Sequence, residues 1–180
     1  DQFPDRVRAL LLDGAVDPSQ APLEASVAQA TGFETALRAF VEDCLGREDC
    51  ALGEAGDDVE DGVRTLTEFL EGTAEQPLDN TADGREVNRA RAELGVMSAL
   101  YSEELWERVR QGLADGMEDG DGTVLLQLAD DLYSRGDPAA YENSTAMLTA
   151  VNCSDAPGPR EVDAYEQAAQ AAGEESPLFG

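Results

Sequence analysis

The residues best suited to covalent chemistry in this chain of 180 residues are its three cysteines, Cys44, Cys50 and Cys153. Cys44 and Cys50 are separated by "LGRED", which ends a predicted helix and enters a turn. A disulfide is sterically easy there and would add about 2 kcal/mol by closing a short loop. The alternative is two unrelated thiols, but Cys50 falls in a polar stretch where a free thiol is a liability. We therefore predict a Cys44–Cys50 disulfide, an oxidising compartment and an unpaired Cys153.

Histidine is absent from the chain, and its absence excludes several kinds of catalytic site. Neither a Ser-His-Asp or Cys-His relay nor a histidine metal site can be assembled from these residues alone. The sequence also lacks a G-x-S-x-G motif and a glycine-rich phosphate loop before a helix. We expect no catalytic residue, no metal site and no cofactor in these 180 residues.

One acidic stretch, residues 57–68, approaches the pattern of a calcium-binding loop. Asp57 and Asp61 occupy the first and fifth positions of such a loop. Val59, however, stands at the third position, where an oxygen ligand is needed. A surface helix capped by Asp57 or Asp58 explains the stretch better.

Net charge is the strongest feature of the composition, because 39 acidic residues against 12 basic ones give a formal charge of −27. Non-specific nucleic-acid binding is excluded, since it requires a cationic surface, and docking to anionic lipid is disfavoured. The acidic residues either form a solvated surface or attract cations and amines. Apolar runs are too short for a membrane span, so we predict none.

Helical patterns cover most of the chain after residue 19. Apolar residues between Phe33 and Cys44 recur on one face of a helix. The polar stretch from Gly72 to Gly84 contains Pro77 and is predicted to be a loop. Further helices are predicted after Asp57 or Asp58, at 86–100, after Ser102, at 124–132 and at 160–172, and 139–151 is either a helix or a helix leading into a short strand.

These helical segments do not repeat at a fixed period, so a solenoid is not expected. We predict a mainly α fold, an irregular helical bundle preceded by one β-strand. The helices should pack around seven apolar side chains: Phe33, Phe40, Leu66, Phe69, Leu105, Val109 and Leu128.

The predicted strand lies near the N-terminus. Residues 7–12 are mostly apolar, Asp13-Gly14 stops the run, and Asp17-Pro18 ends any regular structure. Such a run is typical of a strand buried on both faces of a parallel sheet. Residues 19–180 offer no neighbouring strand, so we expect 7–13 to be extended without a parallel partner within the chain.

Five motifs, in order along the chain, resemble one known family. "FPDRVRALLLDGAVDP" (3–18) resembles the strand after the nucleophile helix in secreted α/β-hydrolase serine peptidases of the tripeptidyl aminopeptidase type. "GFETALRAFVEDCLGREDC" (32–50) resembles that family's first cap helix with its cysteine pair. The stretches 99–130 and "AVNCSDAP" (150–157) resemble later cap segments, and "SPLFG" (176–180) resembles the P-x-F-G before the family's chain returns to its sheet.

The resemblance implies that the chain is the middle of an enzyme. Residues 1–18 would be a remnant strand of the α/β-hydrolase core, and 19–180 the helical cap, or lid. The nucleophilic serine would precede Asp1, and the acid and histidine of the triad would follow Gly180, so no catalytic residue is carried over to this chain. The implied parent is a secreted, extracellular bacterial serine exopeptidase that removes short peptides from free N-termini. The partner of Cys153 would lie beyond "SPLFG".

A cap of this kind would exclude water, limit substrate length and supply carboxylates for the ammonium group of the substrate. Asp155, within the matched "NCSD", and Glu142 are the candidates for that amine site. Both are also explained as ordinary exposed carboxylates among the 39 acidic residues. The implied partners are the missing hydrolase core and a peptide with a free N-terminus.

A second reading is a non-enzymatic acidic helical module that binds a peptide or protein in an apolar groove. It would explain the missing triad without a missing parent protein. It does not explain the isolated strand or the odd cysteine. A reading frame encoding G-x-S-x-G upstream and a histidine downstream would separate the two readings.

Overall fold

The computed structural model describes residues 4–11, 13, 15, 17, 19–133, 143–156 and 158–180. This part of the chain is mainly helical, as predicted. Its β pairing is confined to two isolated bridges, Leu78 with Val87 and Asp79 with Asp121. The elements in chain order are η1 (Pro4–Arg6), α1 (Pro22–Leu45), α2 (Val59–Glu75), α3 (Arg89–Ala99), η2 (Glu103–Leu105), α4 (Trp106–Asp119), α5 (Thr123–Leu132), α6 (Ser144–Asp155) and α7 (Val162–Glu175).

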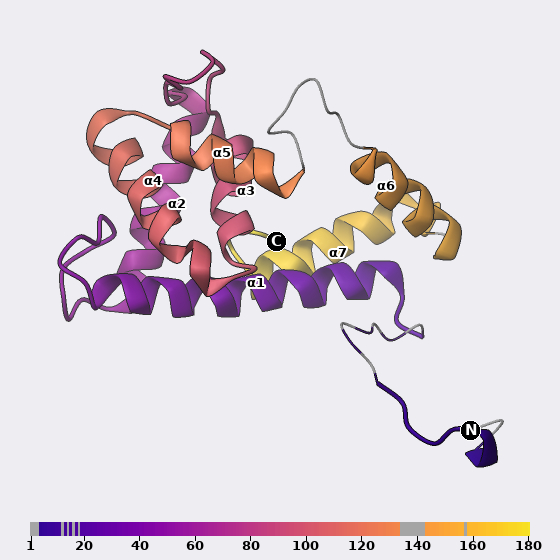
Figure 1. Cartoon of the computed structure of the whole chain (residues 1–180). Helices are drawn as coiled ribbons and strands as arrows, with labels where there is room; N and C mark the ends of the chain where they lie inside the picture. Colours follow the sequence, from indigo (N-terminus) through magenta and orange to yellow (C-terminus); the bar gives the residue numbers. More distant parts are fainter. Residues whose placement is uncertain are drawn as a thin grey trace.

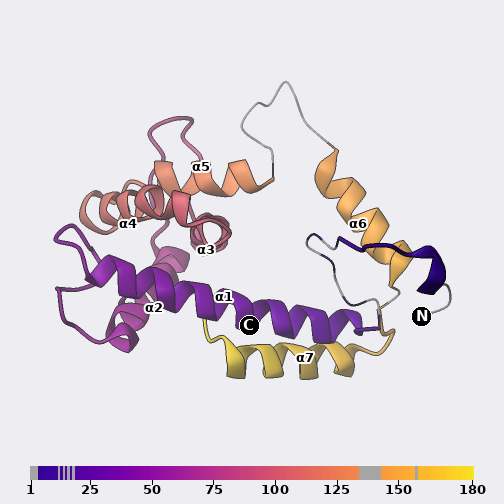
Figure 2. The same cartoon turned by 60° about the horizontal axis from the view of Figure 1, so that its bottom comes forward.

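The long helix α1 organises the bundle (Figure 1). One side of α1 is covered by α7, which runs along it, and another by α2. The most extensive packing in the bundle is between α3 and α5. Seen from below, α7 lies on the opposite side of α1 from α3, α4 and α5 (Figure 2). The result is two layers of helices joined along α1.

The helix starts follow from side-chain caps. Asp58 accepts a hydrogen bond from the Glu60 backbone N–H at the start of α2, as the sequence suggested. Asn88 caps α3 in the same way, accepting from the Arg91 backbone N–H. Ser102 starts the short η2 turn, which leads directly into α4. Polar side chains that satisfy free backbone N–H groups therefore set these three boundaries.

The first helix begins at Pro22, within the region predicted to be helical, because proline is well accommodated in the first turn of a helix. One predicted boundary was wrong. The predicted loop starting at Gly72 is too long, since α2 continues through Gly72 to Glu75. A single glycine near a helix end costs about 1 kcal/mol, which the burial of Thr73 and Leu70 in the same turns can offset.

The core lies between α1, α2, α3, α4 and α5. Four predicted core residues are fully buried: Phe40, Leu66, Val109 and Leu128. Phe69 and Leu105 are partly buried and pack against this core, while Phe33 is half-buried and contacts two other aromatic rings.

A close helix–helix approach in this core depends on one glycine. Gly95 in α3 faces the backbone of α5, and a Cβ built on it would lie 2.3 Å from the carbonyl oxygen of Leu125. No side chain larger than hydrogen fits at that distance. Gly95 therefore sets the spacing of the most extensive contact in the bundle.

Two segments have few or no buried side chains. Helix α6 has none, and it stands apart from α2–α5 in both views (Figures 1 and 2). For residues 139–151 the sequence predicted either a helix or a helix leading into a short strand. The described residues of this region, 143–151, contain no strand, and 144–151 belong to α6, which agrees with the first alternative. Residues 7–11 belong to no helix and form no β pairing among the described residues, and Leu10 and Leu11 are 75% and 93% exposed.

Candidate functional site

The sequence-predicted site residues are distributed over separate parts of the bundle. Cys44 and Cys50 are joined by a disulfide with 5.2 Å between their Cα atoms. Cys153 is a free, exposed thiol on α6. Asp155 is the last residue of the same helix and is exposed. Glu142 lies outside the described residues.

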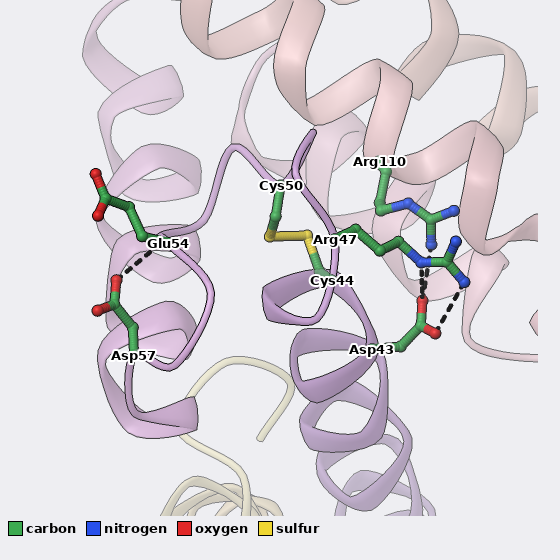
Figure 3. Close-up of a disulfide and its surroundings, with 7 residues drawn as sticks. All are labelled: Asp43, Cys44, Arg47, Cys50, Glu54, Asp57 and Arg110. Atoms are coloured by element: carbon green, nitrogen blue, oxygen red, sulfur yellow. Dashed lines mark hydrogen bonds and ion pairs between the residues drawn. A yellow bond between two sulfur atoms is a disulfide. The ribbon is translucent and has the colours of Figure 1, made fainter.

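The disulfide closes the C-terminal end of α1 (Figure 3). Next to it, Asp43 accepts hydrogen bonds from Arg47, two residues beyond the end of α1, and from Arg110 of α4. The hydrogen bond from Arg47, together with the charges of both arginines, holds the pKa of Asp43 below its ordinary value. The disulfide and these two ion pairs hold this end of the bundle together, and the carboxylate of Asp43 is occupied by the two arginines.

A groove of about 590 Å³ lies between α1, α3 and the C-terminal residues. We call it the α1–α3 groove. Its floor is apolar and includes Phe33, Leu94 and Met97. An ion pair from α3, Arg89 Nε to Glu93 Oε1 at 2.5 Å, borders it. A groove with an apolar floor and a charged edge is suited to hold an extended peptide or a side chain.

An aromatic cluster forms one end of this groove. The ring of Phe33 packs edge-on against Tyr101, with 5.3 Å between ring centroids, and tilted against Phe179 at 5.7 Å. Tyr101 remains 61% exposed. The cluster joins α1, the α3–α4 connection and the C-terminal segment, so it fixes the shape of the groove from three separate elements.

The C-terminal segment is held in place by a buried hydrogen bond. Ser176 is fully buried, and its Oγ donates to Glu34 Oε2 of α1 over 3.3 Å. Glu34 also accepts from Arg38 Nε at 2.9 Å. The Phe179 backbone N–H then donates to Ser176 Oγ, which seats Phe179 at the groove. The short "SPLFG" motif therefore acts as a wall of the α1–α3 groove.

Sequence reasoning missed this groove, although a signal for it was present. Phe33 and Phe179 each fall within a motif that resembled the peptidase family, yet the two motifs are far apart in the chain. Only the packing of α1 beside α7 brings them together.

A second polar cluster fastens the connection between α2 and α3 to α5. Arg85 donates to both carboxylate oxygens of Asp130, at 3.1 and 2.5 Å, and also to Asp83. Thr123 of α5 donates to Asp121 and Asn80. The carboxylate of Asp130 raises the pKa of Arg85 above its ordinary value. Every cation in this cluster is paired, so its role is to hold the connection rather than to bind a charged ligand.

The described residues contain no group of three or more histidine, cysteine, aspartate or glutamate side chains that could hold a metal ion. Among those residues, none of the helices is both long and apolar enough to cross a membrane. With no histidine in the sequence, the chain can supply binding surface but no histidine base for a serine nucleophile.

No family model matches the chain. Proteins similar to it are nevertheless found among bacterial hydrolases. The chain is 35% identical to Carboxylesterase B of Mycobacterium tuberculosis over 170 residues, which are 94% of this chain and 32% of that protein. It is 36% identical to the Serine protease Hip1 of the same organism over 160 residues, covering 87% of this chain and 31% of the protease.

A Tripeptidyl aminopeptidase of Streptomyces lividans is 28% identical over 161 residues, which are 28% of its length. The chain thus spans about a third of the length of the relatives it matches. It is related in sequence to one segment of a group of serine hydrolases and peptidases, and the resemblance drawn from the five motifs is confirmed.

Proposed function

We propose that residues 19–180 form the cap of a serine exopeptidase and that residues 1–18 lead into the cap from its α/β-hydrolase core. The observation that carries this proposal is the partial match to much longer relatives, one of which is a serine protease and another a tripeptidyl aminopeptidase. The nucleophile, the acid and the histidine would lie in the remaining part of the protein. The cap would shape substrate binding without performing the acyl transfer itself.

The α1–α3 groove is the surface that we propose faces the substrate. In the resembling family, the chain returns to its core just after the segment matching "SPLFG". Leu178, Phe179 and Gly180 line the groove, so this part of the cap would lie beside the core. An apolar floor of Phe33 and Met97 would then accommodate a substrate side chain while closing of the cap excludes water.

The charge of the chain suits a substrate with a free N-terminus. A net charge of −27 attracts an ammonium group and disfavours a polyanionic substrate. Asp155 and Glu142 are proposed as the carboxylates that bind this amine. The short Cys44–Cys50 disulfide supports an exported protein, since such bonds persist in oxidising compartments.

Filling the α1–α3 groove with a larger side chain tests whether it is part of the substrate-binding surface. Met97→Trp should narrow the α1–α3 groove in the complete protein and raise KM for tripeptides with large apolar side chains. Glycine-rich tripeptides should be affected much less, which provides a matched substrate control. An unchanged KM for both substrates would remove the groove from the substrate-binding surface.

The proposed amine site is tested by comparing free and blocked substrates. Asp155→Asn in the complete protein should raise KM for a free tripeptide by roughly tenfold, the loss expected for one charge-assisted hydrogen bond. An N-acetylated peptide has no ammonium group, so its slower turnover should not change. Equal effects on both substrates would assign Asp155 a structural role instead.

The alternative function is that of an acidic module that binds a peptide without cleaving it. The groove favours it in one respect, because a groove lined by apolar side chains suits a bound peptide. The isolated chain would then bind apolar peptides on its own with the same affinity as the complete protein.

A further inference from the structure

Helix α6 has an exposed apolar face made by Met147, Leu148 and Val151. These side chains are 53%, 60% and 47% exposed, respectively, and no residue of the helix is buried. Each of α1 to α5, in contrast, buries several residues in the core. We call these three side chains the α6 face.

The spacing of the three residues places them together. Positions i, i+1 and i+4 lie on one side of an α-helix, as these residues do. Asp155 follows Val151 by four residues and therefore lies at the C-terminal end of the same face. Thr149 and Cys153 lie on the other side of the helix.

A helix of this length needs a partner. Helix α6 has 12 residues, and isolated helices shorter than roughly 12–15 residues are marginally stable in water. Its apolar face is also the kind of surface that soluble proteins use for contact with another part or partner. No residue of this helix is buried by the described parts of the bundle.

A second copy of the chain is a poor candidate for that partner, because two molecules with a charge of −27 each repel one another. The remaining part of the same polypeptide is a better one. The relatives are about three times as long as the matched segment, so most of such a protein lies outside residues 1–180. Leu10 and Leu11, in the predicted core strand, are also exposed.

We propose that the α6 face docks onto the hydrolase core of the same polypeptide. This inference rests on the proposed function and adds to it the contact surface of the cap. The docked face would carry Asp155 to the boundary between cap and core. The contact would also supply the tertiary packing that α6 lacks in the isolated chain.

Methionine oxidation by dilute hydrogen peroxide measures this contact directly. Met147 should oxidise several-fold more slowly in the complete protein than in the isolated 180-residue chain, because docking buries its sulfur. Met97 and Met117 are partly buried in the bundle. Met117 serves as the internal reference, since it lies away from the groove. Equal oxidation rates of Met147 in the two proteins would overturn the proposal.

A pair of variants separates docking from folding. Leu148→Asp should leave Tm of the isolated chain unchanged, since Leu148 is exposed there, but should restore rapid Met147 oxidation in the complete protein. Thr149→Asp adds the same charge on the other side of the helix, and it should neither change Tm of the isolated chain nor restore rapid Met147 oxidation in the complete protein. Continued protection of Met147 in the Leu148→Asp variant would reject the α6 face as the contact.

The outcome is independent of whether the proposed activity is found. A complete protein that cleaves tripeptides but leaves Met147 exposed would retain the proposed function and lose this inference. A protein that protects Met147 but has no peptidase activity would lose the proposed function and retain the contact between the two parts.

Discussion

Arg110 of α4 donates a hydrogen bond from Nη1 to Oδ2 of Asp43 in α1 over 2.9 Å. The side chain of Arg110 is 8% exposed, whereas that of Asp43 is 30% exposed. Asp43 also forms an ion pair with Arg47, which lies just beyond the end of α1. A buried guanidinium in the second layer of helices is thus neutralised by a carboxylate one residue before the disulfide.

Removing the carboxylate of Asp43 should destabilise the folded protein. Asp43→Ala would leave the charge of Arg110 buried without its partner, and we expect a loss of about 3 kcal/mol in the free energy of unfolding. The matched control is Asp61→Ala, because Asp61 pairs with Arg64 where both side chains are more than half exposed. For this control variant, chemical denaturation should show a loss of less than about 1 kcal/mol in the free energy of unfolding. Similar losses for both variants would contradict the role assigned to Arg110.

Gly95→Ala tests the close approach of α3 and α5. Its Cβ would overlap the carbonyl oxygen of Leu125, so the helices must separate. We expect a loss of about 1–3 kcal/mol, as for other overpacked cores. Gly72→Ala is the control, since nothing lies within 4 Å of its added methyl group and it should stabilise α2. If Tm shifted in the same direction in the Gly95→Ala and Gly72→Ala variants, this explanation would be contradicted.

The disulfide prediction is tested by peptide mapping without reduction. Trypsin cleaves after Arg47, between Cys44 and Cys50, so the two resulting peptides should remain linked, while Cys153 is recovered alkylated. Reducing the bond should cost about 2 kcal/mol in the loop-entropy estimate. A bond from Cys153 to either of the other cysteines would overturn both the pairing and the argument for a partner outside the chain.

Asp121 gives a pH-dependent prediction. Hydrogen bonds from the Thr123 hydroxyl and backbone N–H lower the pKa of Asp121 in the folded protein, so folding favours its charged form. Its contribution is therefore fully present above the ordinary aspartate pKa of 3.8 and is lost as the pH falls through the lowered value. The Tm difference between wild type and Asp121→Ala should be largest near neutral pH and should shrink as the pH falls below the ordinary aspartate pKa of 3.8. A difference that is constant over this range would contradict the assignment.

Local patterns predicted the bundle well because its caps and apolar faces are local features. Asp58 caps α2 as predicted, whereas Ser102 caps the η2 turn that leads into α4 rather than α4 itself. Leu66 and Val109 are buried on the predicted faces. Helix α1 begins at Pro22, within the region after residue 19 that the sequence predicted to be helical. Its first turns, residues 22–32, continue into the buried part of α1, and α1 packs against α7.

The α1–α3 groove could not be predicted because it depends on contacts between distant residues. Ser176 and Glu34 meet across 142 positions of the chain, and no periodicity connects them. The same holds for Arg85 and Asp130, whose ion pair fixes the α2–α3 connection. What the sequence did provide was the family resemblance, which came from short motifs rather than from any site geometry.

The most direct test of the proposed function compares the isolated chain with the complete product of its reading frame. Both are assayed with chromogenic tripeptides that have free N-termini, with and without a serine-directed phosphonate. The complete protein should release the chromophore in a phosphonate-sensitive reaction, and the 180-residue chain should show no turnover, because it has no histidine base. Phosphonate-sensitive turnover by the isolated chain, or an inactive complete protein, would contradict the assignment of this chain as a peptidase cap.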